Sequence, residues 1–117
     1  MKCHKDLNVW NRSIELVITV YQITKDFPKE ETYGLVSQMR RSMISIPSNI
    51  AEGAARQSKK EFRQFLYIAS GSVSELDTQL IICNKLLLIN DDSFRIITDE
   101  LSQIKKMLFG LLNSIKG

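Results

Sequence analysis

Histidine, cysteine, proline and glycine are all scarce in this chain of 117 residues, which has one, two, two and five of them, respectively. The single histidine, His4, lies outside the predicted helices. It can supply neither the paired Glu-x-x-His of di-iron bundles nor a Ser-His or Cys-His nucleophile pair. Cys3 and Cys83 are not in a CxxC spacing, so neither a zinc site nor a disulfide framework is indicated. So few glycines and prolines also argue against an all-β fold, which needs many turns.

Long apolar runs and phosphate-binding loops are missing as well. No apolar stretch approaches the roughly 18 residues that would cross a bilayer, and the N-terminus is polar, unlike a secretion signal. We therefore expect a cytoplasmic protein without a membrane segment. Gly34 and Gly53 are isolated, which excludes a glycine-rich loop that cradles phosphates.

Three carboxylates, Glu52, Glu75 and Asp77, are the candidates for a hydrolytic cluster. Such residues are more often solvated or ion-paired, and Arg56 follows Glu52 by four residues, the spacing of a helical ion pair. We predict no catalytic residue, no metal and no cofactor, and therefore a protein that is not an enzyme.

What the chain does contain is ordinary globular composition with a mild positive charge. Apolar residues make up 44% and charged residues 25%, which argues against disorder. The length favours a single domain over residues 1–117. A net charge of +3 permits a polyanionic partner but does not require one.

Helical periodicity is the strongest pattern in the sequence, and it predicts four helices, over residues 6–26, 31–54, 59–89 and 93–116. The first carries a stripe of Leu7, Trp10, Ile14, Val17 and Tyr21, with Asp6 as its cap. The second contains Pro47, which predicts a kink in one helix, with two shorter helices as the alternative. Gly53 is expected to terminate this helix.

The third and fourth predicted helices begin at recognisable caps. Ser58 and Glu61 have the capping-box spacing, and Asn90 to Ser93 separate the two helices. Gly71 lies in the middle of the third helix, where we expect it to let a neighbouring backbone come close. Apolar stripes then run to Leu87 and from Phe94 to Ile115. The predicted fold is all-α, an antiparallel up-down-up-down four-helix bundle with short links.

Two segments, residues 14–23 and 80–89, are more apolar than one face of a bundle requires. A helix that is apolar all round must be covered all round, so self-assembly is the expected cover. Unusually tight packing within a monomer is the alternative.

Basic residues gather at the end of the predicted bundle that holds both termini. That end has seven cations, including Lys2, Lys5 and Lys116, against three carboxylates, whereas the opposite end has a net charge of −1. Lys59 and Arg63 share a helix face with Gln64 and Tyr67 nearby, which suits contact with backbone phosphates. Solvated charges are the alternative. The candidate nucleic-acid-binding residues are Arg40, Arg41, Arg56, Lys59, Lys60 and Arg63.

Several strings resemble the signature of the 23S rRNA intervening-sequence proteins. They are Phe27 to Leu35 (FPKEETYGL), Gln38 to Arg41 (QMRR), Ser45 to Gly53 (SIPSNIAEG), Glu61 to Leu66 (EFRQFL) and Ala69 to Ser72 (ASGS), with the opening Leu7-x-Val9-Trp10. The resemblance covers about residues 7–90, and the last predicted helix matches in pattern only. It implies a bacterial four-helix bundle.

A relative with this fold, the accessory variability protein of diversity-generating retroelements, forms a basic homopentamer that binds nucleic acid and a reverse transcriptase. The resemblance therefore implies a homopentamer, with RNA or DNA and a reverse transcriptase as possible partners. Our first hypothesis is a non-catalytic oligomeric module for RNA or RNA–DNA hybrid, binding through backbone phosphates. The alternative is a protein-interaction scaffold that docks a partner such as a reverse transcriptase and has no direct role with nucleic acid.

Overall fold

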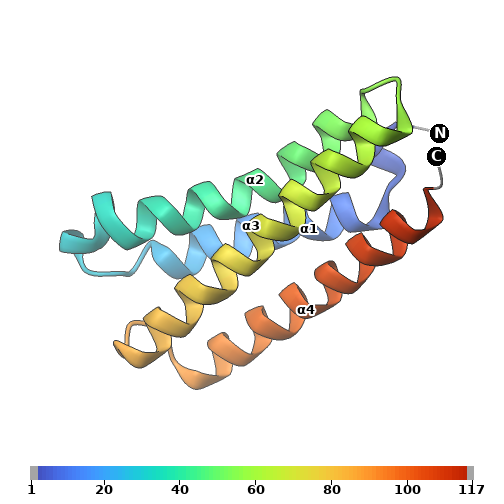
Figure 1. Cartoon of the computed structure of the whole chain (residues 1–117). Coiled ribbons are helices and arrows are strands. Elements are labelled where there is room, and N and C mark those ends of the chain that lie inside the picture. The colour runs from blue at the N-terminus through green and yellow to red at the C-terminus, as the bar shows by residue number, and fades with distance from the viewer. Residues whose placement is uncertain (1–2, 116–117) are drawn as a thin grey trace.

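Four α-helices form one elongated bundle in the computed structural model, which describes residues 3–115 (Figure 1). They are α1 (Asn8–Thr24), α2 (Ser37–Ala54), α3 (Lys59–Lys85) and α4 (Asp91–Ser114). The all-α four-helix fold expected from the sequence is confirmed. Figure 1 shows successive helices running in opposite directions, with α2 against α3 and α4 beside α3. None of these helices is long and apolar enough to cross a membrane.

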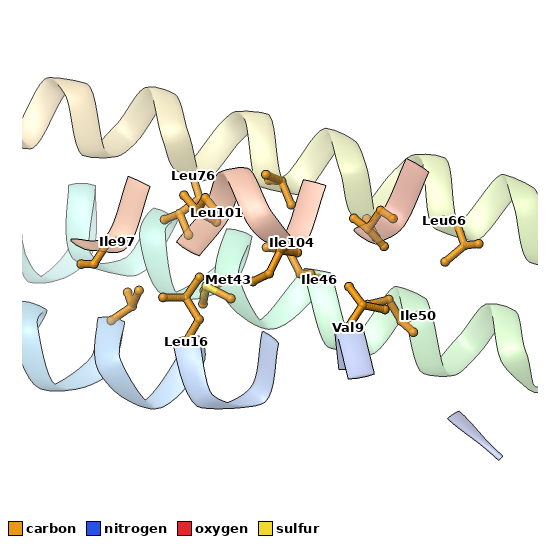
Figure 2. Close-up of a cluster of buried hydrophobic side chains, with 14 of the residues drawn as sticks. Val9, Leu16, Met43, Ile46, Ile50, Leu66, Leu76, Ile97, Leu101 and Ile104 are labelled. Carbon is orange, nitrogen blue, oxygen red and sulfur yellow. The ribbon is translucent and has the colours of Figure 1, made fainter. Parts of the chain in front are cut away.

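The core is a continuous apolar layer along the bundle axis, to which all four helices contribute (Figure 2). Its largest fully buried side chains are Met39, Met43, Ile46, Ile50, Leu66, Leu76, Leu80, Ile97, Leu101, Ile104, Leu108 and Leu112. Helices α2, α3 and α4 supply all of these residues. Burial of such side chains, each worth about 1.5–3 kcal/mol, is the main force that holds the helices together.

Helix α1 does not bury the stripe that the sequence favours. Its buried residues are Val9, Ser13, Leu16, Val20 and Thr24, a face that is only partly apolar. The predicted stripe instead stays half-buried or exposed, with Leu7, Trp10 and Val17 half-buried and Ile14 and Tyr21 exposed. Asp6 is not the cap either, because it belongs to the short 3₁₀ turn η1 (His4–Asp6) and the helix begins after Leu7. The predicted stripe therefore lies beside the buried face: Leu7, Trp10 and Val17 pack against the edge of the core, and Ile14 and Tyr21 are left exposed.

The segment before α2 is helical but not α-helical, so the predicted start at residue 31 is wrong. A 3₁₀ turn, η2 (Lys29–Glu31), is followed by a π-helical turn, η3 (Thr32–Val36), and no side chain caps either one. Threonine and glycine are weak helix formers, and this segment contains Thr32 and Gly34. From Ser37 the helix continues unbroken past the buried Pro47, which excludes the alternative of two shorter helices.

The sequence predicts a close approach between helices at Gly71, but the structure has it at Gly53. A methyl group on Gly53 would lie 2.7 Å from Cβ of Phe65 and 3.0 Å from Cδ1 of Phe62, so α3 packs directly on the α2 backbone there. Gly53 is therefore a buried contact inside α2 rather than its terminator. Around Gly71, by contrast, nothing lies within 4 Å of the same position.

The predicted start of α3 at residue 59 is confirmed by its cap, whereas α4 is capped by Asn90 and begins two residues before the predicted start at residue 93. Ser58 Oγ accepts the amide N–H of Glu61 at 3.0 Å, and Asn90 Oδ1 accepts that of Ser93 at 2.7 Å. Helix α4 therefore begins at Asp91.

Helix α3 ends at Lys85, four residues earlier than predicted. The amide of Leu88 donates to the carbonyl of Cys83 at 2.9 Å and that of Leu87 to Asn84 at 3.1 Å, the paired bonds of a Schellman cap. Leu87 takes the left-handed position of this cap, with φ 61°, which glycine usually occupies. The sequence has no glycine there to mark the helix end.

Candidate nucleic-acid interface

The six candidate cations lie in two separate groups. Arg56, Lys59, Lys60 and Arg63 surround the link between α2 and α3, whereas Arg40 and Arg41 lie towards the start of α2. Arg40 lies 14 residues before the end of α2 at Ala54, a distance of about 21 Å along the axis, and Arg56 lies beyond that end. The structure therefore does not bring the two groups together. Lys2 and Lys116, which we had counted at the basic end, lie outside the described residues.

Arg40 and Arg41 make contacts with neighbouring residues of α1 and α2. The guanidinium of Arg40 lies 4.2 Å from the ring centre of Tyr21, and its Nε donates to Thr24 Oγ1 at 3.1 Å. Arg40 thus ties α2 to α1 by a cation–π contact and a hydrogen bond. Arg41 is exposed and donates to Ser37 Oγ at 3.4 Å.

Arg56 is largely compensated by neighbouring carboxylates. Its guanidinium lies 3.0 Å from Glu52 Oε1 and 4.0 Å from Glu61 Oε2, which confirms the ion pair expected between Glu52 and Arg56. It also lies 5.0 Å from the ring centre of Phe65. Arg56 therefore adds less net charge to the surface than its sequence position suggests.

Arg63 has a structural contact as well as a charge. Its Nη1 donates to the carbonyl of Leu112 and, at 2.8 Å, to that of Ile115. These carbonyls belong to the C-terminal end of α4, where the helix dipole favours a cation. Arg63 thus caps α4 from the neighbouring helix, while its Nη2 lies 3.5 Å from Tyr67 Oη.

Lys59 and Lys60 are exposed at the start of α3. Lys59 and Arg56 stand at the rim of an open cavity of about 440 Å³, whose apolar lining includes Phe62, Leu111 and Ile115. No ion pair of the described residues involves either lysine. Both ammonium groups therefore face solvent with their charge available.

Three residues that sequence reasoning missed extend this basic group along the bundle. Lys105, Lys106 and Phe109 lie on α4, and Lys105 Nζ donates to Ser74 Oγ of α3 at 3.0 Å. Together with the N-terminal part of α3 they form a surface that we call the cationic face. It consists of Lys60, Arg63, Tyr67, Lys105, Lys106 and Phe109.

The signal that could have found this face is a shortage of acid. Residues 53–74 and 101–115, which contain it, have six lysines and arginines and a single carboxylate, Glu61. Their net charge is +5, whereas the rest of the chain has a net charge of −2. The small positive charge of the protein is thus concentrated on the N-terminal part of α3 and the C-terminal part of α4.

The two cysteines and the metal-ligating side chains form no reactive centre in the described part of the chain. Cys83 is fully buried, and burial raises the pKa of its thiol to about 11. Its Sγ lies 3.4 Å from Met39 Sδ in the core. Between residues 3 and 115 no three histidine, cysteine, aspartate or glutamate side chains gather so as to hold a metal ion.

An all-α bundle with one cationic face is the class that this geometry defines. Residues 5–110 match the family model described as 23S rRNA-intervening sequence protein. The chain belongs to this family, as its sequence strings indicate.

A solved structure from Bacteroides thetaiotaomicron VPI-5482, a protein of unknown function from the S23 ribosomal protein family, has a similar fold. The TM-score is 0.83 at 24% identity, over 90% of this chain and 95% of that one. At this identity the likeness shows the fold alone. No curated protein matches the chain.

Proposed function

We propose that this protein is a non-catalytic, oligomeric module that binds RNA through its backbone phosphates. The observation that carries the proposal is the net charge of +5 on residues 53–74 and 101–115, of which Arg56 is paired with Glu52 just outside these segments, within a chain whose remainder is negative. Lysine and arginine that neutralise phosphates release bound counterions, and this release drives binding that is independent of sequence. Contacts to backbone phosphates position a protein on nucleic acid without reading its sequence, so we expect them to supply most of the affinity.

Oligomerisation is supported by an apolar face on the other side of the bundle, formed by Ile14, Ile18, Tyr21 and Ile44. These side chains are 37–54% exposed. The contacts of Arg40 with Tyr21 and Thr24 set the level of α2 against α1, so that Ile44, one turn further along α2, is level with Ile18. An exposed apolar patch across two helices is typical of an association surface.

A second apolar surface lies at the tip where α3 meets α4. Ile82, Leu86 and Leu87 are exposed there, Leu87 to 89%. Leu87 adopts an unfavourable left-handed conformation and gains no burial within its own chain. Two separate apolar surfaces are what a head-to-tail contact between copies requires, because each copy then contributes a different one. Copies joined in this way bring several cationic faces onto one strand of RNA.

The test is binding of fluorescently labelled RNA to the full chain, measured by anisotropy over a series of salt concentrations. We expect affinity to fall steeply with salt, and the triple variant Lys60→Glu, Lys105→Glu, Lys106→Glu to lose at least 100-fold in affinity at low salt. Arg63 is left unchanged because it caps α4. The matched control, Lys25→Glu, Lys29→Glu, Lys85→Glu, makes the same charge change outside the cationic face.

Two results would contradict the proposal. One is absence of RNA binding by the wild-type chain at low salt. The other is an equal loss of affinity in the triple variant and in its matched control, because total charge and not the cationic face would then determine binding. Retention of the wild-type circular dichroism spectrum shows that each variant is folded.

A further inference from the structure

Two aromatic side chains stand exposed on the cationic face, where burial would be the usual state. Tyr67 of α3 is 51% exposed and Phe109 of α4 is 42% exposed. Large aromatic side chains gain most when they are covered, so an exposed pair needs an explanation. Both belong to the part of the protein that carries the excess positive charge.

Each ring has cations of its own helix one turn away. Arg63 precedes Tyr67 by four residues, and its guanidinium lies 5.9 Å from the ring centre. Lys105 and Lys106 precede Phe109 by four and three residues, the spacings at which helix side chains are neighbours. Both helices therefore have cations within one turn of an exposed ring, with Arg63 beside the Tyr67 ring and Lys105 Nζ directed to Ser74 Oγ.

The two rings lie at a similar level of the seam between α3 and α4. Arg63 contacts the carbonyl of Ile115 at one end of the seam, and Ser74 contacts Lys105 at the other. Tyr67 and Phe109 fall between these two contacts, on facing helices. Ser74 lies 14 residues beyond Lys60, so the seam between them is about 20 Å long.

The surface beside Tyr67 is also open. Gly71 follows Tyr67 by one turn, and nothing lies within 4 Å of the place that a side chain would occupy on it. A glycine in the middle of a helix costs about 1 kcal/mol relative to alanine. In this helix the cost is not offset by close packing of another helix, and the result is unobstructed space next to the ring.

We propose that the seam between α3 and α4 binds single-stranded RNA, with two of its bases stacked on Tyr67 and Phe109 and its phosphates on the flanking cations. The inference rests on the proposed function and deepens it by naming the form of nucleic acid. Stacking on aromatic rings beside a positive groove is how proteins bind single strands without reading sequence. A duplex keeps its bases stacked on one another, so it cannot use the two rings.

The seam also has a defined end. Past Lys105 it opens into a cavity of about 420 Å³, whose polar lining includes Asp77, Thr78 and Ser102. The carboxylate of Asp77 repels phosphates, so the strand leaves the seam near Lys105. The length between Lys60 and Lys105 accommodates several phosphates at about 3.4 Å per nucleotide.

The test compares an oligoadenylate strand of about 20 nucleotides with the duplex that it forms with oligouridylate. Anisotropy on the full chain should show the single strand binding about tenfold or more tightly than the duplex. Tyr67→Leu and Phe109→Leu keep apolar bulk but remove the ring, and each should weaken strand binding about tenfold. Tyr67→Phe keeps the ring and should bind as the wild type does.

The outcomes separate the two proposals. Duplex binding as tight as strand binding, or unchanged strand binding in the double leucine variant, would overturn the stacking site and leave the proposed function standing. Failure of the wild-type chain to bind strand and duplex alike would overturn both. We expect the leucine variants to bind the duplex as tightly as the wild type does, since the phosphate contacts remain. If the variants lose duplex affinity as much as strand affinity, the rings have a structural role only and the stacking site is wrong.

Discussion

The α1–α2 side and the α3–α4 side of this bundle expose different chemistry on the same scaffold. The first presents four large apolar side chains, with Arg40 held against Tyr21. The second presents lysines with two aromatic rings and no carboxylate between residues 62 and 74 or 101 and 115. Under the proposed function the first side serves contact between copies and the second binds a polyanion, with the core common to both.

Disrupting the apolar face should have the largest effect. In the variant Ile18→Glu, Ile44→Glu, the two carboxylates would have to be desolvated in any contact between copies, which is strongly unfavourable. We expect the oligomer to dissociate to single copies in light scattering, and RNA affinity to fall because multivalency is lost.

The control for this variant is Ile96→Glu. Ile96 is 66% exposed on α4, outside the apolar face, and its substitution should leave the mass unchanged. A wild-type chain that is already a single copy in dilute buffer would refute the assignment of this face.

The next largest effect is expected inside the bundle, at Gly53. Gly53→Ala forces a methyl group against Phe65 and Phe62, so it should destabilise the fold by about 2 kcal/mol. Gly71→Ala meets only open space and should stabilise α3 by about 1 kcal/mol. Urea unfolding followed by circular dichroism measures both changes in the free energy of unfolding. If both variants were destabilised, or both stabilised, the predicted difference between the two glycines would be wrong.

Within the cationic face, Arg63 should differ from Lys60. Arg63→Ala removes the cap from the end of α4 and should lower stability by about 1 kcal/mol, whereas Lys60→Ala should leave it unchanged. Both should weaken RNA binding. Thermal unfolding distinguishes them, and a loss of stability in Lys60→Ala of the same size would show that the two cations have similar structural roles.

The smallest effect concerns Leu87, at the apolar tip. Leu87→Gly relieves the left-handed conformation and removes a side chain with almost no burial, so it should raise the stability of the fold by about 1 kcal/mol. The same variant should weaken assembly if the tip is a contact between copies. Urea unfolding and light scattering on one sample test the two expectations. If assembly is unchanged, the tip is not part of the contact between copies.

The sequence was sufficient for most of the fold because α3 and α4 each have a continuous apolar stripe and a side-chain cap. Helix α1 has apolar residues on two sides, and the hydropathy pattern favours the side that the structure buries less. Its buried side contains Ser13 and Thr24, whose hydroxyls donate to carbonyls of their own helix, so these polar groups can be buried. Which side turns inward is decided by the neighbouring helices, and a single helix does not reveal that.

The site was harder to predict because its residues meet across helices. From the sequence Arg63 is expected to be a free cation, but in the structure it donates to two carbonyls at the end of α4, 49 and 52 residues away. Arg40 and Arg41 form a conspicuous doublet, yet they lie about 20 Å from the end of α2, after which the other candidates follow. Lys105 and Lys106 lie on a side of the bundle, so the difference in charge between its two ends gives no sign of them.

Lysine acetylation of the wild-type chain, with and without saturating single-stranded RNA, tests the central assignment most directly. Mass spectrometry reports every lysine in one sample, so Lys25, Lys29 and Lys85 serve as internal controls for the cationic face. Protection of Lys60, Lys105 and Lys106 with undiminished labelling of the controls is the predicted result. Equal protection of both sets, or free labelling of the three face lysines in the complex, would contradict the account.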